Sequence, residues 1–539
     1  MLIALSKDNK SRIARTSPYF SKYLYLSRAA KKLFKVLNSL RGTVDPKLLV
    51  KYLIIGIILW FGIYLYICFN WEPSTVFYWQ LILSRLAIIL FIFLTVLWIS
   101  NHWRSFFMSR GSPFNLAVFR IIFFGYFTIG FLLEGSSFHE YLLHFVRLPE
   151  SARISPVGMH WLISVLPINE RILGAMTICF GLAAFGSTIG YKRKVSISIF
   201  VLTGLYLFAI PNLSGKINHN HHTIWIAAIL IFSPCTERFS VDHWLKQKEE
   251  KAHFKNKNYQ LPFNLIWILM VIIYFFPGFW KIWTSGLDWA LTENVRNQMY
   301  WKWYEIGEWS PLLRIDQYPL LYRFAGLFTI AFELLFVWFI FNRKTRFIAA
   351  LAGIIFHLGT FAFMNIFFVT LVIAYVSFIN WEKLLPQMTS NSIESIEDKM
   401  SASIGIKIIG GLLIIGNLCF GVFKINSFPL TVYPSFDTIT EDYTKTLSFS
   451  YADEEGQVFF LDKEILKKVY SSERYRNMEY QIIQAFENEN LDSKAPLVRA
   501  LISHLEIPQR SDVHISVDQV SVIPGSRGIV LDSQPISFD

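Results

Sequence analysis

The sequence predicts an all-α polytopic membrane domain of about 9–11 helices, joined to a small C-terminal extramembrane domain that is α+β or β-rich. Three observations predict this fold class. Of the 539 residues, 53% are hydrophobic and only 17% are charged. The hydrophobic residues gather in runs close to the roughly 20 residues that a helix needs to cross a bilayer. Tyr and Trp, which favour the membrane–water interface, are abundant.

The apolar runs divide the chain into five predicted parts. A basic N-terminal segment, 1–51, precedes two additional transmembrane helices in 52–100. The main membrane domain covers 103–385, a last helix covers 404–423, and an extracytoplasmic domain covers 424–539. The individual runs lie near 52–70, 80–100, 113–134, 172–190, 195–211, 223–235, 262–281, 318–341, 347–382 and 404–423.

Two runs depart from the length of one crossing. The run 223–235 is short and predicts a partial span. The run 347–382 is too long for one upright helix. It contains Gly359 and Asn365, which favour a break, so we expect two short helices there and eleven crossings in total.

The polar C-terminal part has a different pattern. The segments "TKTLSFSYADEEGQVFFLD" and "DVHISVDQVSVIPGSRGIVLD" alternate partly between apolar and polar residues and contain turn residues, as strands and hairpins do. The segment "APLVRALISHLE" predicts an amphipathic helix. These elements together predict the small α+β or β-rich domain.

The net charge of +12 is a topology signal rather than a nucleic-acid signal. Residues 1–51 carry twelve Lys and Arg against Asp8 and Asp45. Positive charge beside a first span holds that side in the cytoplasm. Four basic loops fall in alternate connections, all on the side of the basic N-terminus if each run crosses once, which predicts a cytoplasmic N-terminus and a C-terminal domain outside. This predicts a multi-pass protein of a plasma or inner membrane. The basic segment could also lie on an anionic leaflet as an amphipathic helix.

The histidine and cysteine patterns predict no metal site. The four cysteines have no zinc spacing and form no disulfide framework. The segment "KINHNHHTIW" holds His219, His221 and His222, but it brings no carboxylate or cysteine with zinc spacing. An interfacial loop is therefore favoured over a metal centre.

Ionisable residues inside the apolar runs are the candidate functional residues. Each costs roughly 2.5–3.5 kcal/mol on insertion scales and needs a reason to be there. Lys281 ends its run and is either an interfacial anchor or a base in an apolar pocket. His357 is flanked by apolar residues, and Glu333 is an intramembrane acid that needs a partner. Arg120 either anchors an anionic group or serves packing through backbone carbonyls.

Five segments resemble the vitamin K-dependent gamma-carboxylase family, whose wider grouping is the horizontally transferred transmembrane (HTTM) domain. They follow the order of the family over residues 103–385. The segments are "RGSPFNLAVFRIIFFGYF", "LAAFGSTIGYKRKVS", "NHNHHTIWIAAILIFSPCTERFSVDHWL", "YFFPGFWKIWTSGLDW" and "FHLGTFAFMNIFFVTLVIAYVSFINW". Five matches in order are more specific for the domain than for the activity.

The resemblance implies an integral membrane enzyme that couples epoxidation of vitamin K hydroquinone to carboxylation of glutamate. Lys281 falls on the position of the lysine base, and His221 and His357 fall on functional histidine positions. In the family, oxygen adds to the deprotonated hydroquinone, the resulting strong base removes a glutamate γ-proton, and carbon dioxide captures the carbanion. Such intermediates need a water-excluded site.

The resemblance also predicts the ligands and partners. Reduced vitamin K is the predicted cofactor, with O2 and CO2 as co-substrates and no metal. The candidate cofactor-binding residues are Phe276, Phe279, Trp280 and Arg120. Membrane lipid, a quinone and a glutamate-containing protein or peptide on the outer side are the predicted partners; nucleic acid is not.

Departures from the family keep a second interpretation open. The runs 52–70 and 80–100 are additions, "IWTSG" separates Lys281 from "LDW", and the tail is shorter than in the animal enzymes. The alternative is a non-catalytic quinone- or lipid-binding HTTM protein whose outer domain binds a partner. Such a protein should tolerate Lys281→Arg, whereas a carboxylase needs the amine. A transporter is less favoured because no inverted repeat is visible.

Overall fold

A computed structural model describes most of the chain after residue 72. The described residues are 73–107, 111–154, 167–217, 220–247, 257–307, 309–388, 402–433, 436–453, 455–505, 507 and 513–536, with scattered positions between 51 and 66. The chain forms two compact units, residues 1–106 and residues 107–539. In the first unit, α4 (Pro73–Phe107) contains the predicted run 80–100. The predicted segment 1–51 and most of the run 52–70 lie outside the described residues.

The second unit contains the membrane helices that follow α4. The long ones are α5 (Pro113–Arg147), α7 (Glu170–Ile189), α8 (Arg193–Ala209), α11 (Leu261–Ser285), α14 (Pro319–Phe341), α15 (Arg346–Met364) and α18 (Ile404–Val422). Short helices connect or flank them: α9 (His221–Phe232), α10 (Val241–Gln247), α12 (Asp288–Leu291), α13 (Asn294–Ile306), α16 (Val369–Ala374) and α17 (Trp381–Leu384). Short 3₁₀ turns lie at Glu150–Ala152, Ile210–Leu213, Ile315–Gln317, Tyr375–Phe378 and Pro386–Met388.

Local sequence explains several helix ends. The side chain of Ser112 caps α5 by accepting a hydrogen bond from the Phe114 N–H, and Pro113 follows at the first helical position. The side chain of Asn169 caps α7, and Gly190 ends that helix in the left-handed conformation at φ 66°. These signals place α7 and α8 as an antiparallel pair joined by a short basic turn.

The predicted membrane fold is confirmed. Within the described residues, eight helices are long and apolar enough to cross a membrane. They comprise α4 and the seven long helices of the second unit, with α8 extended to Leu213. The protein is therefore a multi-pass membrane protein. Two shorter apolar helices, His221–Phe232 and Val369–Phe378, are below the length of about 20 residues that an upright crossing needs. The exact number of crossings stays a prediction.

The run 347–382 breaks where the sequence predicts. Asn365 adopts φ 53° and ends α15 in the left-handed region, which Asn tolerates better than most residues. Residues 365–368 are non-helical before α16 begins at Val369. The break leaves non-helical backbone among the membrane helices, which is tolerated where it is buried or lines a cavity.

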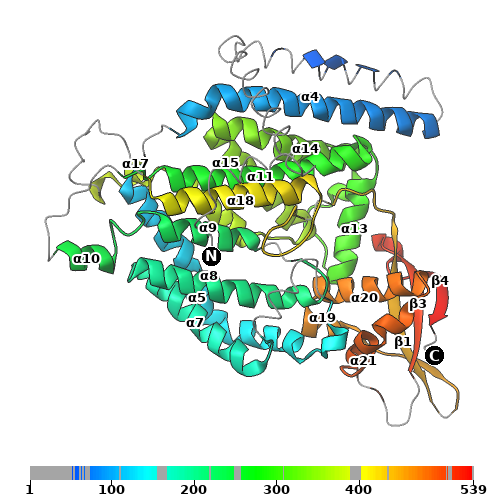
Figure 1. The fold of residues 1–539 in the computed structure, drawn as a ribbon. Helices are drawn as coiled ribbons and strands as arrows, with labels where there is room; N and C mark the ends of the chain where they lie inside the picture. Colours follow the sequence, from blue (N-terminus) through cyan, green and yellow to red (C-terminus); the bar gives the residue numbers. More distant parts are fainter. Residues whose placement is uncertain are drawn as a thin grey trace, which may run out of the picture. The chain divides into compact units, whose positions relative to one another are not determined.

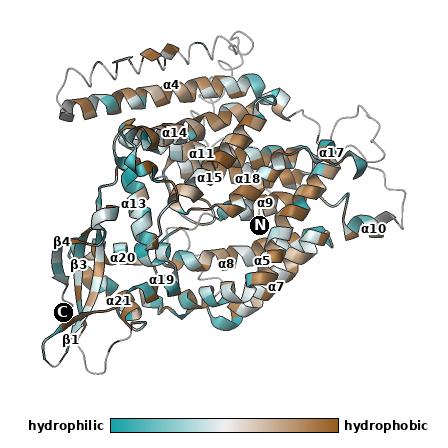
Figure 2. Ribbon diagram, turned by 180° about the vertical axis from the view of Figure 1, so that it is seen from behind, coloured by the Kyte–Doolittle hydropathy of each residue, from teal (hydrophilic) through white to brown (hydrophobic). Residues whose placement is uncertain are grey.

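Helix α11 lies at the centre of the second unit. It packs against α14, α18 and α9, while α5, α7 and α8 pack against one another (Figure 1). In its most apolar window, 83% of the residues are buried, more than in the other seven candidate spans. Figure 2 shows apolar residues along these helices and more hydrophilic residues on α13 and α20. Polar residues of α11 therefore face protein rather than lipid.

The C-terminal part is an α+β domain, as predicted. Its strands are β1 (Tyr443–Ala452), β2 (Val458–Phe460), β3 (Val513–Ser521) and β4 (Val530–Ile536). They form an antiparallel sheet in the order β2-β1-β3-β4, in which Leu447 pairs with Val517. The helices are α19 (Glu464–Tyr470), α20 (Ser472–Glu487) and α21 (Ala495–Ile502), with a 3₁₀ turn at Leu491–Lys494 and another at Pro524–Ser526. Helix α20 packs against β1 and α13 (Figure 1).

Candidate functional site

One stripe of α11 carries two of the polar side chains that meet neighbouring helices, Tyr274 and Lys281. Tyr274, Gly278 and Lys281 follow the i, i+4, i+7 spacing and so share one face of the helix. That face meets α14 and α15, as the partners of Tyr274 and Lys281 show. The aromatic and apolar residues between them pack on other sides of α11. The sequence of this one helix therefore sorts its polar groups toward two particular neighbours.

Lys281 forms a buried ion pair with Glu333 of α14. Its Nζ atom lies 2.8 Å from Oε1 and 2.9 Å from Oε2 of the carboxylate. Lys281 is 3% exposed and Glu333 is 5% exposed. The ammonium also lies over the Trp289 ring, 5.0 Å from its centroid, as in a cation–π contact. Glu333, the intramembrane acid that needs a partner, is therefore paired with Lys281, the candidate base.

Gly278 allows the two helices to approach at this pair. A Cβ atom at position 278 would lie 2.8 Å from Cβ of Glu333 and 3.2 Å from Cγ of Leu334. No real side chain fits at that distance without movement of α14. The absence of a side chain at 278 is therefore a condition for the contact between Lys281 and Glu333.

His357 of α15 belongs to a second hydrogen-bonded group on the same stripe. Its Nε2 atom lies 2.7 Å from the Tyr274 hydroxyl, and the Tyr375 hydroxyl donates to Tyr274 at 2.7 Å. His357 is 1% exposed, and within the described part of the chain its Nδ1 atom has no hydrogen-bond partner. Gly353 makes room for Tyr375, because a Cβ there would lie 1.9 Å from the Tyr375 hydroxyl.

The two histidines at the start of α9 pack against Tyr433. His222 Nδ1 lies 2.8 Å from the Tyr433 hydroxyl, and the His221 ring centroid lies 5.8 Å from the Tyr433 ring. His221 also contacts Phe428 at 5.1 Å between ring centroids. Both histidines are buried, whereas His219 lies outside the described residues. Tyr433 follows α18, the last long membrane helix, so the segment after α18 folds back to reach α9.

Helix packing joins these groups into one network. Tyr274, which is hydrogen-bonded to His357, lies on the same helix face as Lys281, about 10 Å away along the axis of α11. Helix α9, which begins with the two histidines, packs against α11 and α16. The ion pair, the tyrosine pair and the α9 histidines thus lie around one region of the membrane domain. Lys281, His221 and His357 lie on three different helices and have different contact partners, namely Glu333, Tyr433 and Tyr274.

A cavity of about 990 Å³ borders this network on the side of the C-terminal domain. Its wall includes Phe368, Asn220 and Phe436. The Phe368 ring contacts His357 at 5.5 Å between centroids, and Asn220 immediately precedes His221. The Phe436 carbonyl accepts a hydrogen bond from Trp289, the residue under the Lys281 ammonium. The lining residue Phe368 thus contacts His357 directly, whereas Lys281 is reached from the cavity wall through Phe436 and Trp289.

Two of the three aromatic residues predicted to bind a quinone contact α18. Phe276 packs on Gly421, and Trp280 donates to the Gly421 carbonyl at 3.0 Å. Phe279 stacks on Trp283 of α11 itself, at 5.6 Å between ring centroids. Lys281 contacts Glu333 of α14 instead. Their role in quinone binding stays a prediction.

Arg120 lies near the other end of the bundle. Its guanidinium donates to the carbonyls of Cys235, Thr188 and Phe239, at 2.9, 3.3 and 2.5 Å. These carbonyls belong to the loops at the ends of α7 and α9 that precede α11. Helix α11 rises roughly 37 Å at about 1.5 Å per residue, and Lys281 lies near its far end. Of the two roles that the sequence leaves open for Arg120, the structure shows packing through backbone carbonyls, at a site away from Lys281.

Sequence reasoning missed the tyrosines and Trp289. Tyr274, Tyr375 and Tyr433 are ordinary interfacial or core residues by composition, and nothing in their local pattern distinguishes them. A partial signal exists for Tyr274, because it lies seven residues before Lys281 on the same helical stripe. Tyr375 and Tyr433 are brought in by the α15–α16 break and by the C-terminal segment, which only the folded chain shows.

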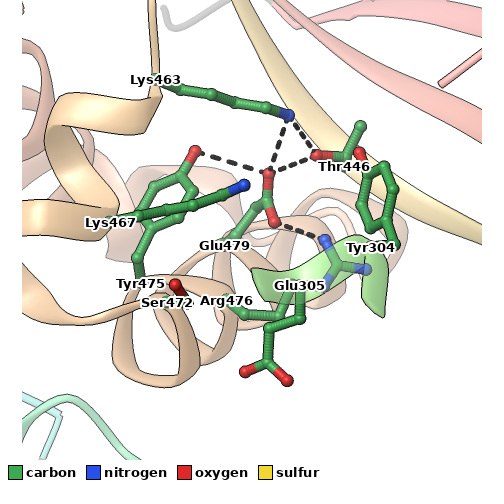
Figure 3. Close-up of a pocket in the computed structure, with 9 residues that line it drawn as sticks. All are labelled: Tyr304, Glu305, Thr446, Lys463, Lys467, Ser472, Tyr475, Arg476 and Glu479. Atoms are coloured by element: carbon green, nitrogen blue, oxygen red, sulfur yellow. Dashed lines mark hydrogen bonds and ion pairs between the residues drawn. The ribbon is translucent and has the colours of Figure 1, made fainter. Parts of the chain in front are cut away.

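A second buried carboxylate, Glu479 of α20, lies in the C-terminal domain. It accepts hydrogen bonds from Arg476, Thr446 and Tyr475, and Lys463 is 3.6 Å away (Figure 3). The Leu447 N–H also donates to it. Burial raises its pKa, but the two cations and the Thr446 hydroxyl outweigh burial and hold that pKa below the usual glutamate value. The small cavity beside it measures about 10 Å³, room for about one water.

Helix α20 also holds the segment that leads to α9. The Arg474 guanidinium donates to the Lys216 carbonyl, and Asn477 Nδ2 donates to the Ser214 carbonyl at 2.8 Å. Lys302 of α13 bonds both Glu305 and Glu473, at 2.9 and 2.7 Å. Burial lowers the pKa of Lys302, but these two carboxylates outweigh burial and raise it. The C-terminal domain is therefore ion-paired to the cavity wall rather than tethered loosely.

The fold and the site define a class: a multi-pass membrane protein with an ionisable network buried among its helices beneath an extramembrane α+β domain. Comparison with known families is specific within that class. A model of the HTTM domain matches residues 109–381, and the chain belongs to the HTTM domain family. This is the domain found in the vitamin K-dependent carboxylase family. No curated protein and no solved structure matches the chain.

Proposed function

We propose that this HTTM protein is a membrane enzyme similar to vitamin K-dependent gamma-glutamyl carboxylase. One observation carries the proposal: three residues that line one cavity each lead to a candidate residue. Phe368 contacts the His357 ring, Asn220 precedes His221, and the Phe436 carbonyl accepts a hydrogen bond from Trp289, which lies under the Lys281 ammonium. Lys281, His221 and His357 resemble functional residues of that family. The cavity volume of about 990 Å³ lies at the upper end of the range for small-molecule sites. It has room for a quinone ring and a glutamate side chain together.

Lys281 acts as the base toward the hydroquinone hydroxyl. Its surroundings are apolar helices and the Trp289 ring, and its exposed fraction is 3%. Water is largely absent there, which strengthens electrostatic interactions and protects reactive species from hydrolysis. The hydroquinone, once oxygenated, supplies the strong base that removes the glutamate γ-proton.

The histidines and tyrosines orient the ring oxygens of the quinone. The buried Nδ1 atom of His357 is available for a hydrogen bond, while Nε2 is fixed by Tyr274. That second bond holds the orientation of the imidazole ring, as outer partners of functional histidines do. His221 lies beside Asn220 at the cavity wall and interacts with the same ligand from the α9 side. These residues fit a ligand with two oxygens on a flat apolar ring.

The protein substrate reaches the site from the extracytoplasmic side. The basic loops place the N-terminus in the cytoplasm, which puts the ends of α11 and α15, the start of α9 and the C-terminal domain outside. The charged residues of the cavity wall include Lys445 of the C-terminal domain, Lys302 of α13 and Lys216, which precedes α9. A glutamate-containing peptide in the cavity would meet the reactive network at its inner end.

Label fixation in membranes containing the protein tests the proposal. Reduced vitamin K, oxygen, labelled bicarbonate and a short glutamate peptide are supplied to wild type and Lys281→Ala. We expect label and quinone epoxide in wild type, and neither in the variant. The matched control is Lys424→Ala, a lysine just beyond the outer end of α18 that contacts Trp280 and Asp437. It should retain both products. Neither product in folded wild type would overturn the carboxylase reading.

A non-catalytic quinone- or lipid-binding protein is the second candidate. The observation that favours it is the complete ion pairing of Lys281 with Glu333, which a purely structural lysine would also show. The two candidate functions predict different effects of the variant Lys281→Arg. Arginine keeps the charge and the ion pair, but it does not give up its proton at accessible pH. A binding protein keeps quinone affinity with this variant, and an enzyme loses turnover.

A further inference from the structure

We propose that Glu333 accepts a proton from the Lys281 ammonium, which frees the Lys281 amine to take the hydroxyl proton of the hydroquinone, so that Lys281 and Glu333 act as one base. The inference rests on the proposed function and identifies a further residue of that reaction. Glu333 acts through Lys281 and is a positioning residue with a proton-accepting role.

The geometry raises a problem that a lysine base alone does not solve. The Lys281 ammonium is shared between both oxygens of the Glu333 carboxylate, at 2.8 and 2.9 Å. An ammonium has no lone pair and cannot accept a proton. A base at this position must first lose a proton, and among the described residues Glu333 is the group hydrogen-bonded to its nitrogen.

A proton shift within the pair solves the problem without creating charge. The ammonium passes one proton to the carboxylate, and the freed nitrogen lone pair takes the hydroxyl proton of the hydroquinone. One O–H bond of the hydroquinone breaks, and its oxygen keeps the electron pair. The pair begins as ammonium and carboxylate and ends as ammonium and carboxylic acid. Its charge rises from zero to +1, which balances the anion formed on the ligand oxygen.

The balance matters because the site excludes water. A lone lysine would begin neutral, or else would hold a buried charge that is expensive without a partner. With Glu333 present, the buried charges sum to zero both before and after the transfer. The other titratable groups near the pair are Tyr274 on α11 and, through it, His357 of α15, Tyr375 and Tyr433. Tyr274 and His357 are hydrogen-bonded to each other, which leaves Glu333 as the carboxylate of the network.

Difference infrared spectroscopy tests the inference. Reduced vitamin K is added anaerobically to membranes with the full-length protein, so that proton transfer is separated from oxygenation. We expect the C=O stretch of a protonated carboxylic acid to appear in wild type and to be absent in Glu333→Gln. The control Glu479→Gln removes an equally buried carboxylate elsewhere, and the band should remain.

Kinetics of epoxide formation supply the second readout. In Glu333→Gln the amide cannot take the proton, so kcat falls about 10²-fold or more while KM for the hydroquinone changes by less than about 3-fold. Glu333→Asp keeps a proton acceptor and recovers part of kcat. A merely structural pair would show the same loss for both variants.

Three outcomes distinguish the claims. The band in wild type together with rescue by Glu333→Asp supports the inference. Hydroquinone turnover without a carboxylic acid band overturns the inference and leaves the proposed function standing, with the amine alone as base. No hydroquinone binding by folded wild type overturns both.

Discussion

Two of the buried carboxylates, Glu333 in the membrane domain and Glu479 in the C-terminal domain, have opposite surroundings. Glu479 is 1% exposed and is held by two cations, two hydroxyls and a backbone N–H. Glu333 is similarly buried, but Lys281 is its hydrogen-bond partner within the described residues. The number of donors, rather than burial, separates the two sites.

The difference teaches what each carboxylate can do. A carboxylate that accepts hydrogen bonds from several fixed donors is stabilised as an anion, and protonation would break several bonds at once. A carboxylate held by one ammonium can exchange a proton with it at no cost in net charge. Glu479 therefore fastens helix α20 to β1, whereas Glu333 is suited to proton transfer.

The largest expected effect is on Lys281. Replacing it with Met preserves length and packing but removes the nitrogen, so epoxide formation should fall by about 10²–10⁴-fold. Glu333 then becomes a buried acid without its cation. Epoxide yield per folded protein measures the effect. A yield near wild type would show that the Lys281–Glu333 pair is as structural as the Glu479 cluster.

Removing the charge of Glu479 should cost stability rather than chemistry. Glu479→Gln leaves Arg476 and Lys463 without their counter-ion, and breaking a buried pair typically costs about 3–5 kcal/mol. Chemical denaturation followed by Trp301, which donates to Thr444 beside this cluster, reports the change. A decrease of less than about 1 kcal/mol in the free energy of unfolding would contradict this prediction. It would mean that Arg476 and Lys463 regain hydration easily in the variant.

The contact at Gly278 tests whether close packing of α11 and α14 supports the Lys281–Glu333 pair. Gly278→Ala should push α14 away from α11 and cost about 1–3 kcal/mol, because the added Cβ would lie 2.8 Å from Glu333 Cβ. Gly359→Ala in α15 is the matched control, since nothing lies within 4 Å of its added Cβ. The control should be neutral or slightly stabilising. Thermal unfolding in detergent compares the two; equal effects would contradict the close approach.

The smallest effect is on the pH dependence of the C-terminal domain. The pKa of Glu479 is lower in the folded chain than its usual value, so its contribution to stability is complete above that usual value. It is lost as pH falls through the lower, folded-state pKa, by at most about 1.4 kcal/mol per pH unit. Acid titration of wild type and Glu479→Gln checks this sign. The variant should have a flatter acid limb, and a steeper one would contradict the prediction.

Much of the fold was predictable because bilayer crossing imposes a length and a composition on each helix. The break near Asn365 and the change of character after residue 424 followed from single residues and from strand alternation. The site was predictable only in part. Lys281 and His357 stood out because charge inside an apolar run is costly, whereas tyrosines in such a run carry no comparable signal.

The sequence by itself determined the class of protein, the order of its helices and which ionisable residues need an explanation. These properties follow from composition and spacing along one segment at a time. Only the tertiary structure decided that Glu333 is the partner of Lys281, that Tyr274 connects to His357, and that Arg120 lies at the other end of α11. Such pairings join helices far apart in the chain, and they depend on which faces meet when the helices pack.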